Sequence, residues 1–190
     1  MMQRLIAICL AFLWFASTAQ AAVPASWHVD PAKSSLTFTV KVNGQSVNGR
    51  FPGFGALIEF DPANLVQSSA RITIDATGIR TFDATRDAML LKPAWFNVLD
   101  FPQATFQSTG FTANGPGAFV CNGKLTIKGT SKDVSLPFKL SINGNTAMMK
   151  GETTIQRLAF KVGEGPDYTG ETPVSLTVKV FVNIKADRVK

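Results

Sequence analysis

Few residues of this chain have side chains suited to acid–base or metal chemistry. The only histidine is His28, so a Ser/His/Asp triad or a histidine-bearing metal site would have to be built around that residue. No nucleophile elbow, phosphate-binding loop, H-E-x-x-H motif or paired-cysteine spacing occurs. Asp83 and Asp87 are the best-spaced carboxylates, but a position at the start of a helix also explains them. The sequence therefore predicts a protein that is not an enzyme and has no metal site.

The sulfur-containing residues give no stronger indication of a cofactor. Of the two cysteines, Cys9 lies in the N-terminal apolar stretch, and Cys121 lies in a strand-like run that predicts a buried side chain. A haem or metal binder would need axial ligands from a small set of residues: His28, Met89, Met148, Met149 and Cys121. Their sequence neighbourhoods give no reason for them to converge, so no cofactor is predicted.

The N-terminus has the order of a secretory signal. Arg4 precedes the apolar residues 5–15, and Ala19-Gln20-Ala21 supplies small residues for cleavage. The apolar stretch is about half of the roughly 20 residues that cross a bilayer, which leaves an uncleaved signal anchor as the weaker alternative. We predict a signal peptide at 1–21, a single domain at 22–190 and a periplasmic location.

The charge pattern argues against a nucleic-acid partner. Lys and Arg number 19 against 13 Asp and Glu, which gives a net charge of +6. The bases are scattered singly between apolar residues, as at Lys41 and Lys179. Nucleic-acid binding favours clustered bases with interleaved aromatics. Weak attraction to anionic lipid surfaces is the more plausible use of the excess.

Alternation of apolar and polar residues with period two runs through most of the chain and predicts strands. It is clearest at 174–184, where every second residue from Val174 to Ile184 is apolar. The other predicted strands are 36–42, a long one at about 47–60, 70–76, 104–108, 119–127, 134–142 and 147–155. Asn143-Gly144 predicts a tight hairpin, and Asn122-Gly123 predicts a bulge.

A single stretch, 83–96, lacks this alternation and predicts a helix capped by Asp83 and ended or kinked by Pro93. About eight strands with one helical insertion predict an all-β fold, a sandwich or an eight-stranded antiparallel barrel, and a barrel leaves no open edges. The interior of such a barrel is either filled by side chains or wide enough for one small ligand. Composition does not decide between these.

Several short motifs follow one another in a specific order: residues 27–31 with 34–38, 49–51 with Phe54, 60–62, 86–87 ahead of Leu90, 95–96 with 101–106, and 123–129. Through the order of these motifs the chain resembles the YceI-like family of exported, polyisoprenoid-binding, lipocalin-like bacterial proteins. It implies a lipocalin-like barrel whose interior holds a long isoprenoid or similar amphipathic chain. Many members have histidines where this chain has Val42 and Met89, so roles for those imidazoles do not carry over.

The resemblance also implies candidate site residues. The inward apolar faces would line the cavity: Phe38, Val40, Phe51, Ile72, Ile74, Phe106, Leu125, Ile127, Leu136, Phe138, Val178 and Val180. A phosphate or quinone head group needs cations or donors at the mouth, and the bases nearest the insertion are Arg80, Arg86 and Lys92. The alternative for these three is a solvated face on which Arg86 pairs with Asp83.

Two functions compete at this point. The first is a periplasmic carrier of an isoprenoid, a quinone or a similar lipid. The second is an interaction protein with a fully packed barrel that docks to an envelope partner or to a membrane redox protein of the cytochrome b561 type. A small inward residue replaced by a large one, such as Ala70→Phe or Gly123→Leu, should reduce lipid uptake in the first case and stability in the second.

Overall fold

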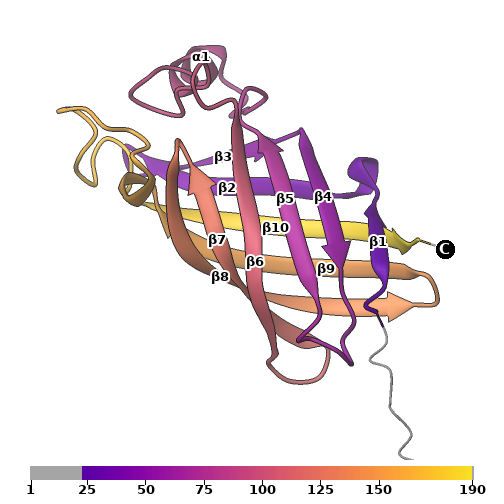
Figure 1. Cartoon of the computed structure of the whole chain (residues 1–190). Coiled ribbons are helices and arrows are strands. Elements are labelled where there is room, and N and C mark those ends of the chain that lie inside the picture. The colour runs from indigo at the N-terminus through magenta and orange to yellow at the C-terminus, as the bar shows by residue number, and fades with distance from the viewer. Residues whose placement is uncertain (1–22, 190) are drawn as a thin grey trace, which may run out of the picture.

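The computed structural model describes residues 23–189 and consists mainly of antiparallel strands (Figure 1). The predicted signal peptide at 1–21 lies outside the described residues. The strands are β1 Ser26–Val29, β2 Ser35–Val42, β3 Gln45–Phe51, β4 Phe54–Glu59, β5 Ser69–Asp75, β6 Gln103–Ala113, β7 Ala118–Ile127, β8 Thr130–Asn143, β9 Thr146–Gln156 and β10 Thr177–Arg188. The helical elements are α1 Ala84–Leu90 and two 3-10 turns, η1 Pro31–Lys33 and η2 Arg157–Phe160.

The strands close into a barrel. From β4 each strand pairs with its neighbour through β10, and β1 pairs with both β4 and β10 to complete the ring. The turn η1 separates β1 from β2, which pairs farther along β10, and Pro52-Gly53 separates β3 from β4. β1 with β2 and β3 with β4 therefore act as two interrupted strands, and the predicted eight-stranded antiparallel barrel is confirmed. Pro52 cannot donate to a ladder, which explains the break within the predicted strand 47–60.

The helical insertion is shorter than predicted. The Asp83 carboxylate accepts a hydrogen bond from the Arg86 backbone N–H at 2.8 Å, which confirms the cap. The helix ends at Leu90, and residues from Leu91 onward form turns. Pro93 disfavours helical geometry at the residue before it, so the helix does not extend to Phe96 as predicted. In Figure 1, α1 and its flanking loops stand over one end of the barrel.

The turn signals are close to their predicted places. The β8–β9 hairpin turns at Gly144, whose φ is +59°, one residue after the strand-ending Asn143. Opposite Asn122-Gly123 the β6–β7 register shifts between Ser108 and Gly110, so the extra residue of the bulge lies on β6 and not on β7. Within residues 23–189 no helix is both long and apolar enough to cross a membrane.

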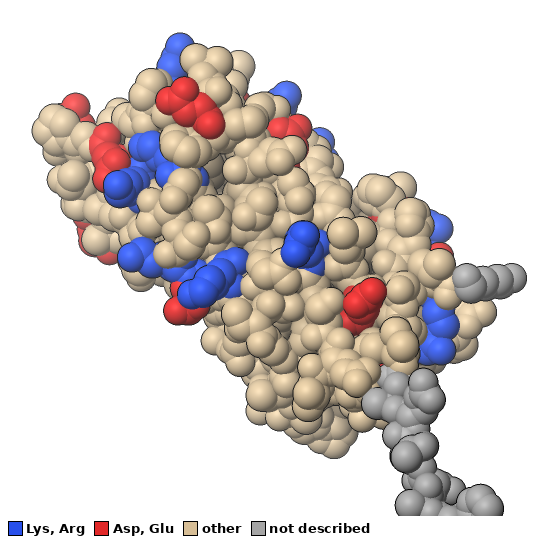
Figure 2. Space-filling model, viewed as in Figure 1, with Lys and Arg blue, Asp and Glu red and all other residues tan. Residues whose placement is uncertain are grey.

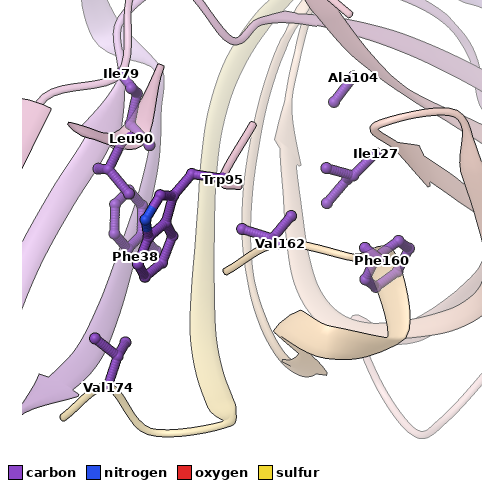
Figure 3. Packing of buried hydrophobic residues seen from close by; sticks show 9 residues of the cluster. All are labelled: Phe38, Ile79, Leu90, Trp95, Ala104, Ile127, Phe160, Val162 and Val174. Atoms are coloured by element: carbon purple, nitrogen blue, oxygen red, sulfur yellow. The ribbon is translucent and has the colours of Figure 1, made fainter. Parts of the chain in front are cut away.

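Buried side chains form two clusters, one toward each end of the barrel. The first, which we call the α1-end cluster, joins α1, η2 and the strand ends beside them, and its buried members are Phe38, Ile79, Leu90, Trp95, Ala104, Ile127, Phe160, Val162 and Val174 (Figure 3). The second, the far-end cluster, comprises Trp27, Val29, Phe60, Phe119, Cys121, Phe138, Ala147 and Ala186. The α1-end cluster fills one end of the barrel, and a cavity can remain beyond it, toward the far-end cluster.

Candidate functional site

A cavity of about 190 Å³ lies inside the barrel, and six of the eight buried members of the far-end cluster line it. A single water molecule needs about 10–15 Å³ of such space, and protein interiors are normally packed with few voids larger than one water. Inward side chains midway along the barrel, such as Ile72 and Val182, are only half-buried, whereas Ile79 and Phe160 in the α1-end cluster are 1% and 2% exposed. The half-buried residues keep accessible surface because they face the void.

The cavity wall is apolar. Among residues 23–189, no charged side chain lines it, and the one hydroxyl there, on Thr153, already donates to the Ser135 carbonyl at 2.8 Å. The Trp27 indole N–H is likewise used, since it donates to the Phe60 carbonyl at 2.9 Å. A molecule in this space therefore meets hydrocarbon and aromatic surface and no free donor, which favours an apolar chain over any polar compound.

Seven of the predicted cavity residues line this space: Ile72, Ile74, Phe106, Leu125, Leu136, Phe138 and Val180. Sequence reasoning missed other lining residues, among them Trp27, Phe54, Phe60, Phe111, Leu140, Met149, Val182 and Ile184. Several of these continue a predicted inward face, as Leu140 continues Leu136 and Phe138. Their alternation was the signal that could have identified them.

The other five predicted residues are placed elsewhere. Phe38, Val40, Phe51, Ile127 and Val178 belong to or pack on the α1-end cluster and do not line the cavity. The Phe38 ring covers Gly49 so closely that a Cβ there would lie 2.2 Å from it, and it packs 5.6 Å from the Phe51 ring. Alternation identifies the inward face of a strand. It does not show which inward residues are covered by loops at the end of the barrel, because those loops come from distant parts of the sequence.

The three predicted head-group cations do not form a common cradle. The Arg86 guanidinium donates to the Thr81 hydroxyl at 2.8 Å and to the Thr81 carbonyl at 3.1 Å. It does not pair with Asp83, which accepts from the Arg86 backbone instead. Arg80 donates to the Ile79 carbonyl, and Lys92 is exposed. Figure 2 shows basic and acidic side chains next to one another at this end of the molecule. All three flank the packed α1-end cluster, outside the cavity.

A buried arginine fastens the segment that closes the α1 end. Arg157, at the start of η2, is 3% exposed, and its guanidinium donates to six backbone carbonyls. The acceptors are Val162, Gly163, Tyr168, Gly170, Val174 and Ser175. Burial lowers the pKa of Arg157, and the charge of Glu171 acts in the opposite direction. No local sequence pattern indicates this role, because the partners are main-chain atoms of an irregular segment.

Cys121 reports on the state of the cavity because it lines the wall and is buried. Burial raises the pKa of its thiol to about 12. The thiolate is the reactive form, so iodoacetamide at pH 8 should label the native protein at least about 100-fold more slowly than the urea-unfolded chain. The folded thiol also stays neutral above its ordinary pKa of 9.0, so the free energy of unfolding should fall as pH rises from about 9 toward about 12. Fast native labelling would contradict the burial of the thiol.

The residues considered for metal or haem ligation are dispersed. Met149 and Cys121 line the cavity, Met89 accepts from the Tyr168 hydroxyl beside α1, and His28 and Met148 are exposed on strands β1 and β9. Among residues 23–189, no group of three or more His, Cys, Asp or Glu side chains is arranged to hold a metal ion. The apolar cavity is therefore the candidate site.

Comparison with known proteins identifies one family. The model of the YceI-like domain matches residues 27–186. A UPF0312 protein of Yersinia pestis is 35% identical over 146 residues, which cover 75% of this chain and 74% of that protein. The crystal structure of Burkholderia cenocepacia BcnA superposes with a TM-score of 0.79 and 33% identity over 83% of this chain and 98% of that one. A polyisoprenoid binding domain from Saccharophagus degradans has a TM-score of 0.67 and 14% identity, covers 87% of this chain and 99% of its own, and shows a shared fold alone.

Proposed function

The chain belongs to the YceI-like domain family, and from that premise we propose that its barrel binds the chain of an isoprenoid or a similar apolar-tailed lipid. The observation that carries the proposal is the apolar cavity inside the barrel, whose lining residues offer no free polar group. The neighbour from Saccharophagus degradans, described as a polyisoprenoid binding domain, supports the same class of ligand. Each buried CH₂ contributes about 0.8 kcal/mol, so a chain of a few isoprene units binds without a specific polar contact.

We further propose that the protein works as a carrier or scavenger in the periplasm. This rests on the secretory order of Arg4, the apolar residues 5–15 and the small residues before position 22. A lipid chain has low solubility in an aqueous compartment, and a protein that encloses it prevents its aggregation. The alternative of a fully packed barrel docking to a cytochrome b561-type redox partner gains no support, because the barrel contains a cavity.

Farnesol, an isoprenoid alcohol of 15 carbons, tests the proposal directly. Native mass spectrometry of the purified protein should show a complex with one farnesol per chain, and a titration should give a micromolar or lower Kd, since the apolar contribution exceeds the entropic cost of association. Glycerol, which has no apolar chain, is the matched negative compound. A protein that binds neither farnesol nor longer prenols at tens of micromolar would refute the lipid-binding proposal and return attention to a protein partner.

A further inference from the structure

Two large apolar side chains project into solvent from the turns on either side of α1. Phe82, directly before the helix cap, is 75% exposed, and Leu99, in the turn that leads to β6, is 90% exposed. Single exposed apolar residues are common on folded proteins, so exposure alone does not identify a binding surface. These two differ because hydrogen-bonded turns hold both of them in their exposed positions.

The backbone keeps the Phe82 ring outside the barrel. Its φ is +63°, a left-handed conformation that is unusual for a bulky residue. On one side, buried Thr81 donates its N–H and its hydroxyl to the Asp87 carboxylate, each at 2.6 Å. On the other side, Asp83 caps α1 by accepting from the Arg86 N–H at 2.8 Å. Gly or Asn would adopt this conformation more easily, so a phenylalanine here indicates a use for the exposed ring.

A second hydrogen-bonded turn presents Leu99. The Asn97 carbonyl accepts from the Asp100 N–H at 3.1 Å and from the Phe101 N–H at 2.9 Å. The Asn97 side-chain amide donates to the Asp100 carboxylate at 2.9 Å, and the φ of Asn97 is +49°. Leu99 lies within this turn, and its side chain therefore projects from a fixed point.

The helix between the two turns adds an uncharged outer face. Its exposed side chains are Ala84, Thr85 and Ala88, whereas Leu90 is buried in the α1-end cluster. Figure 1 shows α1 and its flanking loops over one end of the barrel. Both apolar side chains and this helix face therefore belong to one end of the molecule. We call Phe82, Ala84, Thr85, Ala88 and Leu99 together the α1 tip.

Exposed bases border the α1 tip. The Arg50 guanidinium lies 5.6 Å from the centroid of the Phe82 ring, Arg80 precedes the tip in the chain, and Lys92 follows α1. Acidic side chains are also present at this end (Figure 2), but each accepts a hydrogen bond within the insertion: Asp83, Asp87 and Asp100. The chain as a whole has a net charge of +6, which favours an anionic surface as its partner.

We propose that the α1 tip docks the protein on an anionic lipid bilayer, with Phe82 and Leu99 inserted among the head groups. The bordering bases Arg50, Arg80 and Lys92 then face the lipid phosphates. Separate apolar side chains gain free energy when they leave water for a bilayer surface, which needs no matching shape. A protein partner would need close packing against the whole surface. The inference goes beyond the binding of a lipid chain, because neither Phe82 nor Leu99 lines the cavity.

Co-sedimentation with vesicles of equal parts phosphatidylethanolamine and phosphatidylglycerol tests this docking site. The wild type should pellet with the vesicles, and the Phe82→Asn/Leu99→Asn double variant should bind at least about tenfold more weakly, because two apolar side chains no longer leave water. Asn tolerates the φ of residue 82, so the double variant should keep a Tm close to that of the wild type. Leu99→Asn alone, at a position without that constraint, should lose part of the affinity.

The matched control removes two comparably exposed apolar side chains from other parts of the surface. Leu57 lies on β4 and is 73% exposed, and Val66 lies in the β4–β5 connection, at the opposite end of β5 from α1, and is 98% exposed. The Leu57→Asn/Val66→Asn variant should pellet as the wild type does. An equal loss in this control would overturn the docking site, because the contact would then involve any exposed apolar side chain.

Other results would also overturn the proposal. A wild type that stays in the supernatant would refute docking on a bilayer and leave a protein as the partner to test. A double variant that pellets like the wild type, with binding removed by salt, would show attraction by the bases alone. Farnesol titration separates this proposal from the proposed function, since the double variant should bind farnesol as the wild type does. A protein that pellets with vesicles but binds no prenol would refute the cavity function and keep the docking site.

Discussion

Replacement of Ala70 by phenylalanine is expected to weaken farnesol binding by at least about 100-fold without unfolding the barrel. Ala70 lies in β5, is buried and lines the cavity, so a phenyl ring at this position points into empty apolar space. If the ring excludes about four methylene-sized groups of the ligand at about 0.8 kcal/mol each, roughly 3 kcal/mol of binding free energy is lost. Calorimetric titration measures the loss, and thermal unfolding shows whether the variant is folded.

The matched control places the same ring on the outer face of the adjacent strand. Leu57 in β4 is 73% exposed and pairs with Arg71, next to Ala70 in β5. Leu57→Phe should bind farnesol as the wild type does, because its ring lies in solvent. Wild-type affinity in a folded Ala70→Phe protein would show that the ligand is outside the cavity. A large loss of stability with unchanged affinity would indicate a barrel that has no space to fill.

Gly123 shows why a small inward residue is not always a place for a larger one. The sequence presents Gly123 and Ala70 as equivalent small positions on inward faces. In the structure, a Cβ at Gly123 would lie 2.4 Å from the Phe106 ring and 2.6 Å from the Gln107 carbonyl oxygen. Gly123→Leu therefore disrupts the β6–β7 pairing before it reaches the cavity, and Ala70 is the position that tests uptake.

The fold could be predicted because strand periodicity is a local property. The alternation of Val178, Val180 and Val182 with Lys179 and Phe181 is visible within a few residues, and in the structure Val180 and Val182 face the cavity. The residue at which this strand, β10, begins was less predictable. Val174 continues the alternation, yet it lies before β10, where it pairs with Val42 and packs into the α1-end cluster.

The site depends on pairings that single segments do not encode. Trp27 from β1, Phe54 from β4 and Phe111 from β6 line one cavity only because the strand ladders bring these segments into one barrel. Arg80, Arg86 and Lys92 are near the insertion in sequence, but they lie beside a packed end of the barrel. Proximity to the insertion in sequence therefore did not indicate whether these three bases reach the cavity.

Arg157→Met is expected to lower the free energy of unfolding by roughly 3–5 kcal/mol and the Tm by about 10 °C. Methionine fills similar space but has no donor, so six backbone carbonyls between Val162 and Ser175 lose their partner. Arg157→Lys keeps the charge with fewer donors and should be intermediate. Chemical denaturation measures the decrease in the free energy of unfolding. Trp95 is buried, and the Arg157 Cζ atom lies 5.8 Å from the centroid of its ring. The fluorescence emission of Trp95 should therefore shift to longer wavelength as the segment between Val162 and Ser175 loosens.

The same variant tests whether the segment after η2 covers the route into the cavity. In that case, loosening the α1 end should strongly accelerate farnesol association while stability falls. An association rate close to the wild-type value would place the route elsewhere. Lys179→Met, which removes an exposed base from β10, is the control for charge loss and should change neither quantity. A stable Arg157→Met protein with unchanged Trp95 emission would contradict the anchoring role, because the carbonyls would have found other partners without moving the segment.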